Sequence, residues 1–179
     1  KKDISNFEDI SSIIEKHDGI FHQAALASVP QSFKEPEKYY KVNVIGTENI
    51  FKIAKQFNSK VVFASSSSVY GDQINFPISE DANKKPLNPY GQTKLDDEKL
   101  ASKYAAQGLR VIGLRYFNVF GIGQNPSYAG VIPQFIQKIS KHESPIIEGD
   151  GNQIRSFTFI DDVVRANYLA FESKIDHAF

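Results

Sequence analysis

Hydrophobic positions along the chain recur in two alternating patterns. Apolar residues at helical spacing mark the ranges 7–17, 37–57, 90–107, 131–142 and 162–173. Between them lie short apolar runs, rich in β-branched and aromatic residues, which predict strands at 20–21, 60–64, 110–117, 146–147 and 154–160. Helices that alternate with short buried strands predict an α/β fold with a doubly wound parallel sheet and right-handed crossovers.

The segments that follow the predicted strands are the first place to look for chemistry, because ligands of doubly wound proteins bind beyond the carboxyl ends of the strands. Three of these segments are HQAALAS at 22–28, SSSSVYG at 65–71 and YFNVFG at 116–121. They are rich in small and polar side chains, although a connecting loop could have had any composition. We therefore expect these three segments to form the site.

The composition excludes several classes of function. Twenty-one basic and twenty-one acidic residues cancel without forming a long run of one sign, so no nucleic-acid or membrane partner is expected. The absence of cysteine excludes disulfides, thiolate metal sites and cysteine nucleophiles. The four histidines show no ligand spacing, and no apolar run approaches the roughly 20 residues of a membrane span. We therefore expect a soluble, cytoplasmic protein that binds no metal.

Tyr90 and Lys94 lie four residues apart at the start of a predicted helix, which places the phenol and the ammonium on one face, one turn apart. An isolated tyrosine, with a pKa of about 10, is a poor base at neutral pH. A cation within ~4–6 Å favours the phenolate. The pair can therefore form a base, but tyrosine and lysine also occur at this spacing as an ordinary surface pair, so the surrounding sequence must decide.

Three segments supply that context in a fixed order: FASSSSVYG at 63–71, NPYGQTK at 88–94 and LRYFNVFG at 114–121. Together they resemble the extended short-chain dehydrogenase/reductase family, in particular its nucleotide-sugar epimerases and dehydratases. The resemblance runs from Asp3 to about Ala170 and includes HQAALASVP, YYKVNVIGTENI, YAGVIPQF and GDGNQIRSFTFIDD. It implies a Rossmann-like fold, NAD as the cofactor and a UDP-sugar as the substrate.

The resemblance also implies three catalytic residues. Tyr90 would take a proton from the sugar 4-hydroxyl while the C4 hydride passes to the nicotinamide. Lys94 would lower the pKa of the phenol and hold the nicotinamide ribose. Ser66 would hydrogen-bond the same sugar oxygen and relay the proton. Ser67 and Ser68 are expected to line the sugar pocket.

The residues at positions 67 and 68 distinguish the reactions of the family. Members that eliminate water carry an acidic pair there, and decarboxylating members tend to carry a glutamate at the second position. This chain has only the hydroxyls of Ser67 and Ser68, which leaves no obvious proton donor for either reaction. We therefore predict an isomerase, a UDP-hexose 4-epimerase that acts on UDP-glucose/UDP-galactose or UDP-GlcNAc/UDP-GalNAc through a 4-keto intermediate. The alternatives are a dehydratase or decarboxylase of the same family and a non-catalytic dinucleotide sensor.

Further contacts follow from matching motifs. The cofactor contacts that the resemblance implies are Asp3, Ile4, Gln23, Ala24, Ala25, Leu26, Ala27, Asn43 and Phe117, in addition to Ser66, Tyr90 and Lys94. The implied substrate contacts are Ser28, Ser67, Asn118, Val131, Ile146, Glu148 and Arg155, in addition to Ser66 and Tyr90. Asp3 could instead be an ordinary loop residue, Asn43 a hydrogen-bonded core amide and Arg155 an edge-strand cation.

The resemblance also predicts the organisation of the chain. Residues 1–130 would be the C-terminal portion of the NAD-binding domain, and residues 131–179 the start of the substrate-binding lobe with returning Rossmann elements. The family's glycine-rich fingerprint is not found in the sequence, so we expect a fragment that lacks the N-terminal βαβ part and the C-terminal lobe and is inactive alone. A homodimer is expected through the helices at 37–57 and 90–107.

Overall fold

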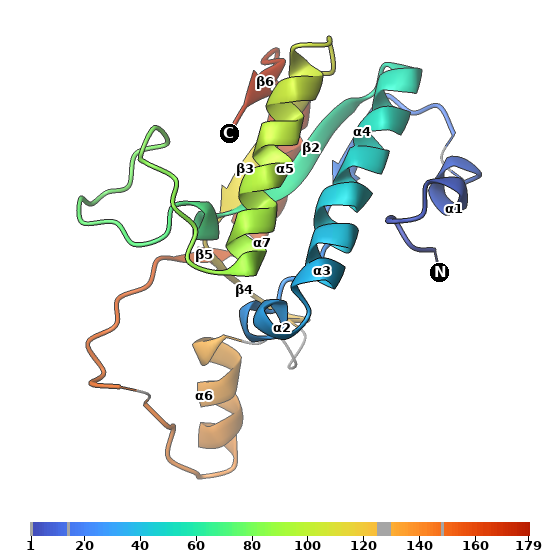
Figure 1. Ribbon diagram of the computed structural model, residues 1–179. Helices are drawn as coiled ribbons and strands as arrows, with labels where there is room; N and C mark the ends of the chain where they lie inside the picture. Colours follow the sequence, from blue (N-terminus) through green and yellow to red (C-terminus); the bar gives the residue numbers. More distant parts are fainter. Residues whose placement is uncertain (1, 14, 125–129, 148) are drawn as a thin grey trace. The chain divides into compact units, whose positions relative to one another are not determined.

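The computed structural model describes residues 2–13, 15–124, 130–147 and 149–179. The chain forms two compact units, one comprising residues 1–115 and 166–179 and the other residues 116–165 (Figure 1). The second unit thus begins earlier than the boundary at residue 131 that the sequence suggested. The reason is that residues 118–120 pair with residues 157–159 as neighbouring strands.

A four-stranded sheet forms the centre of the first unit, with the strand order β1–β2–β3–β6. Its strands are β1 (Gly19–His22), β2 (Lys60–Ser66), β3 (Val111–Tyr116) and β6 (His177–Ala178). β1 runs parallel to β2, with Ile20 opposite Val61, and β3 runs parallel to β6. Every residue of β2 except Ala64 is buried, as in a strand that is covered on both faces.

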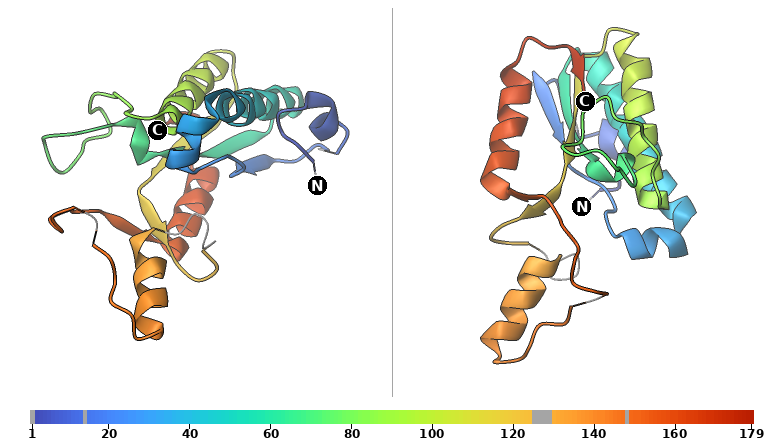
Figure 2. Two further views of the ribbon diagram at one scale, coloured as in Figure 1. Left: turned by 60° about the horizontal axis from the view of Figure 1, so that its bottom comes forward. Right: turned by 90° about the vertical axis from the view of Figure 1, so that its left-hand side faces the viewer.

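Helices cover both faces of this sheet (Figure 2). α4 (Gly46–Phe57) and α5 (Pro89–Ala105) lie side by side on one face, and the C-terminal part of α7 (Ile160–Glu172) lies on the other. The chain enters α4 through α2 (Val29–Lys34), α3 (Pro36–Tyr39) and a π-helical turn, η1 (Tyr40–Ile45). The long helix expected at 37–57 therefore contains a π-helical turn, a feature that often marks a functional site. The predicted Rossmann-like parallel sheet is confirmed.

The core of the first unit lies between the sheet and the helices α4 and α5. Phe51 of α4 and Phe63 of β2 are fully buried, and their rings meet edge to face with 5.7 Å between centroids. Tyr104 of α5 packs on Phe51, again at 5.7 Å. Burial of a large apolar side chain contributes about 1.5–3 kcal/mol. This packing fixes α5 against β2, the two elements that carry the predicted catalytic residues.

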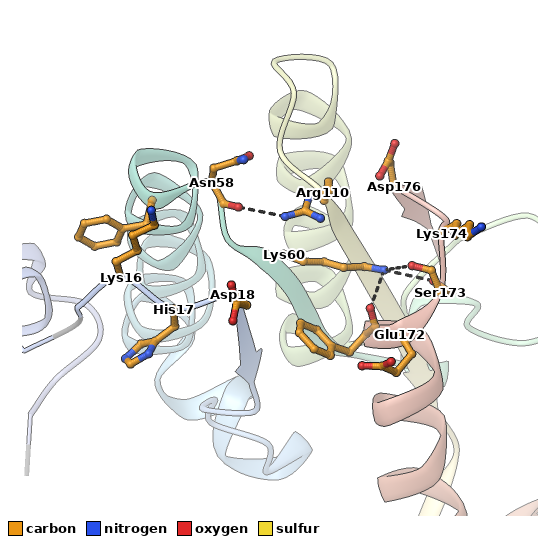
Figure 3. Close-up of a pocket in the computed structure, with 12 residues that line it drawn as sticks. Lys16, His17, Asp18, Asn58, Lys60, Arg110, Glu172, Ser173, Lys174 and Asp176 are labelled. Carbon is orange, nitrogen blue, oxygen red and sulfur yellow. Dashed lines mark hydrogen bonds between the residues drawn. The ribbon is translucent and has the colours of Figure 1, made fainter.

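Lys60, at the amino end of β2, joins the last turn of α7 to the sheet (Figure 3). Its buried ammonium donates to the carbonyl oxygens of Ala170 at 2.7 Å, Phe171 at 3.1 Å and Ser173 at 2.8 Å. Positive charge is favourable at the C-terminus of a helix. A cavity of about 590 Å³ lies beside Lys60, at the amino ends of the strands. None of the residues that line it belongs to the predicted site, which lies at the carboxyl ends.

The described residues of the second unit form a two-stranded parallel sheet, the helix α6 and the beginning of α7. β4 (Asn118–Phe120) pairs with β5 (Phe157–Phe159), and α6 (Val131–Ser140) lies between them in the sequence. The ring of Phe120 packs against those of Phe157 and Phe159, at 6.2 and 5.4 Å between centroids. Among the helices of the described ranges, none has the length and apolar character that crossing a bilayer would require.

Three of the predicted elements are corrected. The strand expected at 146–147 does not form, and the strand expected at 154–160 is reduced to β5. Ile146, Ile147 and Ile154 are 70%, 64% and 89% exposed, so their apolar side chains have no sheet to pack on among the described residues. The helix expected at 7–17 is also shorter, because α1 (Phe7–Ser11) comprises only five residues.

Candidate active site

The four serines that follow the apolar run of β2 have different surroundings. Ser65 and Ser66 are the last residues of β2 and are buried, whereas Ser67 and Ser68 begin a short 3₁₀ helix, η2 (Ser67–Val69), and are half-buried. The hydroxyl of Ser65 donates to Glu98 at 2.7 Å. The hydroxyl of Ser66 caps η2, since it accepts from the backbone N–H of Ser68 at 3.2 Å. The hydroxyls of Ser65 and Ser66 therefore have distinct local roles.

The start of α5 is fixed by a side-chain cap. Asn88 precedes the helix, and its side-chain oxygen accepts from the backbone N–H of Gly91 at 2.8 Å, while Pro89 occupies the first helical position. Tyr90 therefore lies in the first turn, where it is half-buried. The hydroxyl of Thr93 donates to the carbonyl oxygen of Tyr90 at 2.7 Å, which ties the backbone of this turn together.

Gly91 brings the first turn of α5 into direct contact with the serine segment. A Cβ at this position would lie 2.8 Å from the carbonyl oxygen of Ser68, closer than real Cβ contacts allow, and 3.1 Å from the ring of Pro86, which is a tight contact. Only glycine lets the two backbones approach this closely. The structure thus brings the turn of Tyr90 against the segment that begins at Ser66.

Lys94 lies one turn further along α5 and is almost completely buried. Its Nζ is 3.2 Å from Oδ2 of Asp97, which is fully buried three residues later on the same helix. Burial raises the pKa of the Asp97 carboxyl to about 7, although the nearby charge of Lys94 acts in the opposite direction. The sequence analysis missed Asp97. Its only local signal is an acid three residues after the lysine.

His22, the last residue of β1, is buried beside this ion pair. Its Nε2 lies 2.8 Å from the hydroxyl oxygen of Thr47 in α4. Burial lowers the pKa of the imidazole to about 3, and the positive charge of Lys94 lowers it further in the same direction. His22 is therefore neutral near pH 7. His22, Thr47, Asp97 and Lys94 form a buried polar layer between β1, α4 and α5.

Asn43 joins the loop after β1 to α5 from within the π-helical turn. Its side-chain oxygen accepts from the backbone N–H of Leu26 at 2.8 Å, and its amide nitrogen donates to the carbonyl oxygen of Leu26 and the hydroxyl of Thr93, each at 3.0 Å. The side chain is fully buried. Asn43 is therefore a hydrogen-bonded core amide that holds the loop, and its contact with a cofactor stays a prediction.

The loop 23–27 is suited to a ligand that approaches the backbone closely. Ala24 and Ala27 are exposed and small, and the backbone between them is held by Asn43. Gln23 donates to the side chain of Asn167 at 3.1 Å. The loop has small side chains and is held in place by Asn43. Lys94 is a donor for ribose hydroxyls. These features fit a dinucleotide.

Two other predicted contacts of the first unit take part in local turns. The hydroxyl of Ser28 caps α2 by accepting from the backbone N–H of Gln31 at 3.3 Å. The exposed carboxylate of Asp3 accepts from the backbone N–H of Ser5 at 2.9 Å, and this hydrogen bond lowers the pKa of the Asp3 carboxyl. Ile4, next to it, is anchored at its carbonyl oxygen by the amide of Asn49 at 3.0 Å.

The predicted substrate contacts of the second unit are spread over separate segments. Asn118 of β4 donates to the carbonyl oxygen of Ser156 at 2.9 Å, so it lies next to Arg155, which is exposed. Val131 begins α6, and Ile146 lies in the exposed chain after that helix. Phe117 is half-buried between β3 and β4. Glu148 lies outside the described residues.

A buried ion pair behind the serine segment was also missed by the sequence analysis. The guanidinium of Arg115 donates to both carboxylate oxygens of Glu98, at 2.8 and 2.9 Å, and to the hydroxyl of Tyr70 at 2.8 Å. It also donates to the carbonyl oxygen of Glu80 at 2.7 Å. Glu98, paired with Arg115, accepts the hydrogen bond of Ser65, and Arg115 donates to Tyr70. The ion pair therefore stabilises both the end of β2 and the segment that follows it.

Within the described ranges, no three histidine, cysteine, aspartate or glutamate side chains gather as metal ligands would.

Comparison with protein families identifies a match to the NAD dependent epimerase/dehydratase family over residues 1–178. The chain is 37% identical over 171 residues to the UDP-N-acetyl-alpha-D-glucosaminuronate decarboxylase of Bacillus cytotoxicus, covering 92% of this chain and 53% of that protein. It is 38% identical over 175 residues to the UDP-glucuronate 4-epimerase of Thermodesulfobacterium geofontis, covering 95% and 53%.

Solved structures agree with these relationships. The UDP-N-acetylglucosamine 4-epimerase of Methanobrevibacter ruminantium M1 has a TM-score of 0.87 and 42% identity, covering 94% of this chain and 56% of that one. The UDP-glucose 4-epimerase of Thermotoga maritima has a TM-score of 0.94 and 34% identity, covering 99% and 60%. The chain spans about half the length of the curated relatives that it matches. The family predicted from the sequence is confirmed, and the chain belongs to the NAD dependent epimerase/dehydratase family.

Proposed function

We propose that the natural protein carrying this sequence is an NAD-dependent UDP-hexose 4-epimerase whose catalytic residues are Ser66, Tyr90 and Lys94. The observation that carries the proposal is the contact of Gly91 with Ser68, which sets the turn of Tyr90 against the serine segment. The buried ammonium of Lys94 lies one turn along the same helix. The proposal thus assigns a phenol, a hydroxyl and an ammonium to the carboxyl end of a buried strand, where ligands of this fold bind.

In the proposed reaction Tyr90, as the phenolate, takes the proton of the sugar 4-hydroxyl. The positive charge of Lys94 stabilises the phenolate, and the hydroxyl of Ser66 hydrogen-bonds the same sugar oxygen and relays the proton. When bound, NAD supplies the acceptor and later the donor of the hydride at C4. Return of the hydrogen to the opposite face of the 4-keto sugar gives the epimer.

The acids near the serine segment support epimerisation over elimination or decarboxylation. Glu98 is bonded to Ser65, but both of its oxygens are held by Arg115, so it is not a free proton donor. Asp97 is paired with Lys94. Ser67 and Ser68 themselves offer only hydroxyls. The dehydratase and decarboxylase alternatives therefore lack an evident acid at this place, although a decarboxylase stands among the similar proteins.

The ligand contacts proposed from the sequence divide between the two units. The first unit would hold NAD through Asp3, Ile4, Gln23 to Ala27, Asn43, Ser66, Tyr90 and Lys94, and Phe117 of the second unit would add a contact. The UDP-sugar would be held by Ser28, Ser66, Ser67, Tyr90, Asn118, Val131, Ile146, Glu148 and Arg155. The substrates that we propose are UDP-glucose and UDP-GlcNAc with their C4 epimers, because relatives of both specificities are similar to the chain.

We also propose a homodimer formed through α4 and α5. The two helices lie side by side on one face of the sheet, and their outer faces carry exposed polar side chains such as Lys52, Gln92 and Lys99. Sedimentation of the purified protein tests the proposed dimer, and a monomer over the whole concentration range would contradict it.

A cytoplasmic location stays a prediction from the composition.

The proposed reaction is tested by incubating the natural protein and NAD with UDP-glucose and UDP-GlcNAc in separate reactions, followed by chromatographic separation of the C4 epimers. We expect the C4 epimer of at least one substrate to form, and Tyr90→Phe to abolish its formation. A 4,6-dehydrated or decarboxylated product would support the corresponding alternative instead. Tight NAD binding without conversion of any UDP-sugar would support the non-catalytic sensor.

A further inference from the structure

The buried carboxylate of Asp97 is the only charged group that the described residues place in hydrogen-bond contact with the ammonium of Lys94. Asp97 is fully buried and Lys94 is 3% exposed, so neither charge is solvated by bulk water. The two charges are 3.2 Å apart, so each offsets part of the electrostatic potential of the other. Asp97 is therefore the main counter-charge of Lys94 among the described residues.

The groups around Asp97 come from three elements. On α5 itself Lys94 and Asp96 are charged, on α4 Thr47 is polar but uncharged, and on β1 the neutral His22 faces the same ammonium. Thr47 is close enough to Asp97 to lower the pKa of its carboxyl, yet Oδ1 of Asp97 has no hydrogen-bond partner among the described residues. A fully buried, unpartnered oxygen destabilises the folded protein, which calls for a functional reason.

The geometry of the pair suggests that reason. An ammonium has three N–H donors, and Asp97 takes one of them. The direction of that hydrogen bond fixes where the other two donors point. Because Tyr90 lies one turn before Lys94 on the same helix, the remaining donors are available for the phenolate and for a ribose hydroxyl.

We propose that Asp97 is a positioning residue for Lys94: its carboxylate orients the buried ammonium and offsets part of the positive potential that the ammonium exerts on Tyr90. The proposal rests on the proposed function only in giving Tyr90 and Lys94 their catalytic roles. The two effects of Asp97 are separable. Loss of orientation lowers the maximal rate, whereas loss of the negative charge makes the potential at the phenol more positive.

The test is the variant Asp97→Asn in the natural protein, since asparagine keeps the shape and removes the charge. With UDP-sugar and NAD, we expect kcat to fall by about tenfold, because a charge-assisted hydrogen bond is lost, while KM changes little. We also expect the acidic limb of the pH profile of kcat to move to lower pH by about one unit, because the uncompensated ammonium favours the phenolate. A merely structural role would leave that limb unmoved.

Asp96→Asn is the matched control, because Asp96 is the neighbouring acid on α5 and bonds only to Lys99 and Gln92 in the described residues. It should leave kcat and the pH profile unchanged. An Asp97→Asn enzyme with the pH profile of the wild type would overturn the proposal.

A second measurement does not depend on activity or on the variant folding. In wild-type protein with isotope-labelled lysine, the side-chain NMR signal of Lys94, assigned by its loss in Lys94→Arg, should shift in one step near pH 7 as Asp97 ionises. A Lys94 signal that shows no step at any pH at which the protein stays folded would overturn the proposal. If the protein converts no UDP-sugar, the proposed function fails, and this signal still decides whether Asp97 controls Lys94.

Discussion

At the scale of single residues, the site contains polar groups whose ionisation is shifted by burial. Burial between β1 and α4 lowers the pKa of the His22 imidazole and keeps it neutral near pH 7. Burial beside Lys94 raises the pKa of the Asp97 carboxyl. These two groups respond to pH in opposite directions. Protonation of His22 opposes folding, whereas protonation of Asp97 favours it.

His22 should make the protein less stable in acid. Because the pKa of His22 is 6.5 when unfolded and about 3 when folded, its contribution is fully present above pH 6.5 and is lost as the pH falls toward 3. Asp97 acts oppositely, since its contribution weakens as the pH rises from about 4 to about 7. Urea unfolding of wild type and His22→Gln should therefore show that the stability advantage of the wild type shrinks on acidification.

The control for this prediction is His17→Gln, since His17 is an exposed histidine of the same unit. It should follow the wild type at every pH. A stability difference between wild type and His22→Gln that is the same at pH 7 and pH 4 would mean that His22 is not held neutral by the fold.

At the scale of elements, α5 carries most of the proposed chemistry, and its first turn depends on one close contact. Asn88 sets where the helix begins, and Gly91 sets how near it approaches the segment after β2. Tyr90 and Lys94 follow from that placement, because a helix fixes the positions of residues one turn apart.

Gly91→Ala should disturb this contact. The new Cβ would meet the backbone oxygen of Ser68 at 2.8 Å, and a backbone atom cannot move aside as a flexible side chain can. We expect a loss of about 1–3 kcal/mol in the free energy of unfolding, as for other overpacked sites, and a fall in kcat because the turn of Tyr90 shifts. Chemical denaturation and steady-state kinetics measure both effects.

The control is Gln92→Ala, because Gln92 is the next residue and is exposed; this variant should change neither the stability nor kcat. If Gly91→Ala kept the stability and the rate of the wild type, that result would contradict the close contact.

Most of these elements could be predicted from the sequence because their signals are local. The buried run of β2 and the helical spacing of α5 lie in consecutive residues, and both elements were predicted to within two residues of their observed ends. The strand expected at 146–147 was wrong because a pair of isoleucines does not reveal whether a neighbouring strand exists to accept it. The π-helical turn at Tyr40–Ile45 has no comparable local signal.

The residues that the sequence did not reveal act through contacts between distant segments. Glu98 matters because Ser65 and Arg115 reach it from two different strands. Asp97 matters because it is fully buried, which no local pattern indicates. The proposed catalytic residues could be predicted only because their motifs resemble those of a known family. The spacing of Tyr90 and Lys94 alone is equally compatible with a surface pair.

At the scale of the whole molecule, the proposed catalytic residues lie in the first unit, whereas the proposed contacts Asn118 and Arg155 lie in the second. Family membership is established over residues 1–178, while the substrate and the reaction are proposals, since the chain spans about half the length of its curated relatives. The reaction at C4 is thus the central claim, and it can be followed without knowing which sugar is the physiological one.

The most direct test follows a deuterium label at C4 of the UDP-hexose in a reaction with the natural protein and NAD. Epimerisation by Tyr90, Ser66 and Lys94 removes and returns the same hydrogen, so mass spectrometry and NMR should find both C4 epimers with the label still on C4. A product that carries the label at C6, or has lost it to solvent, would contradict the account.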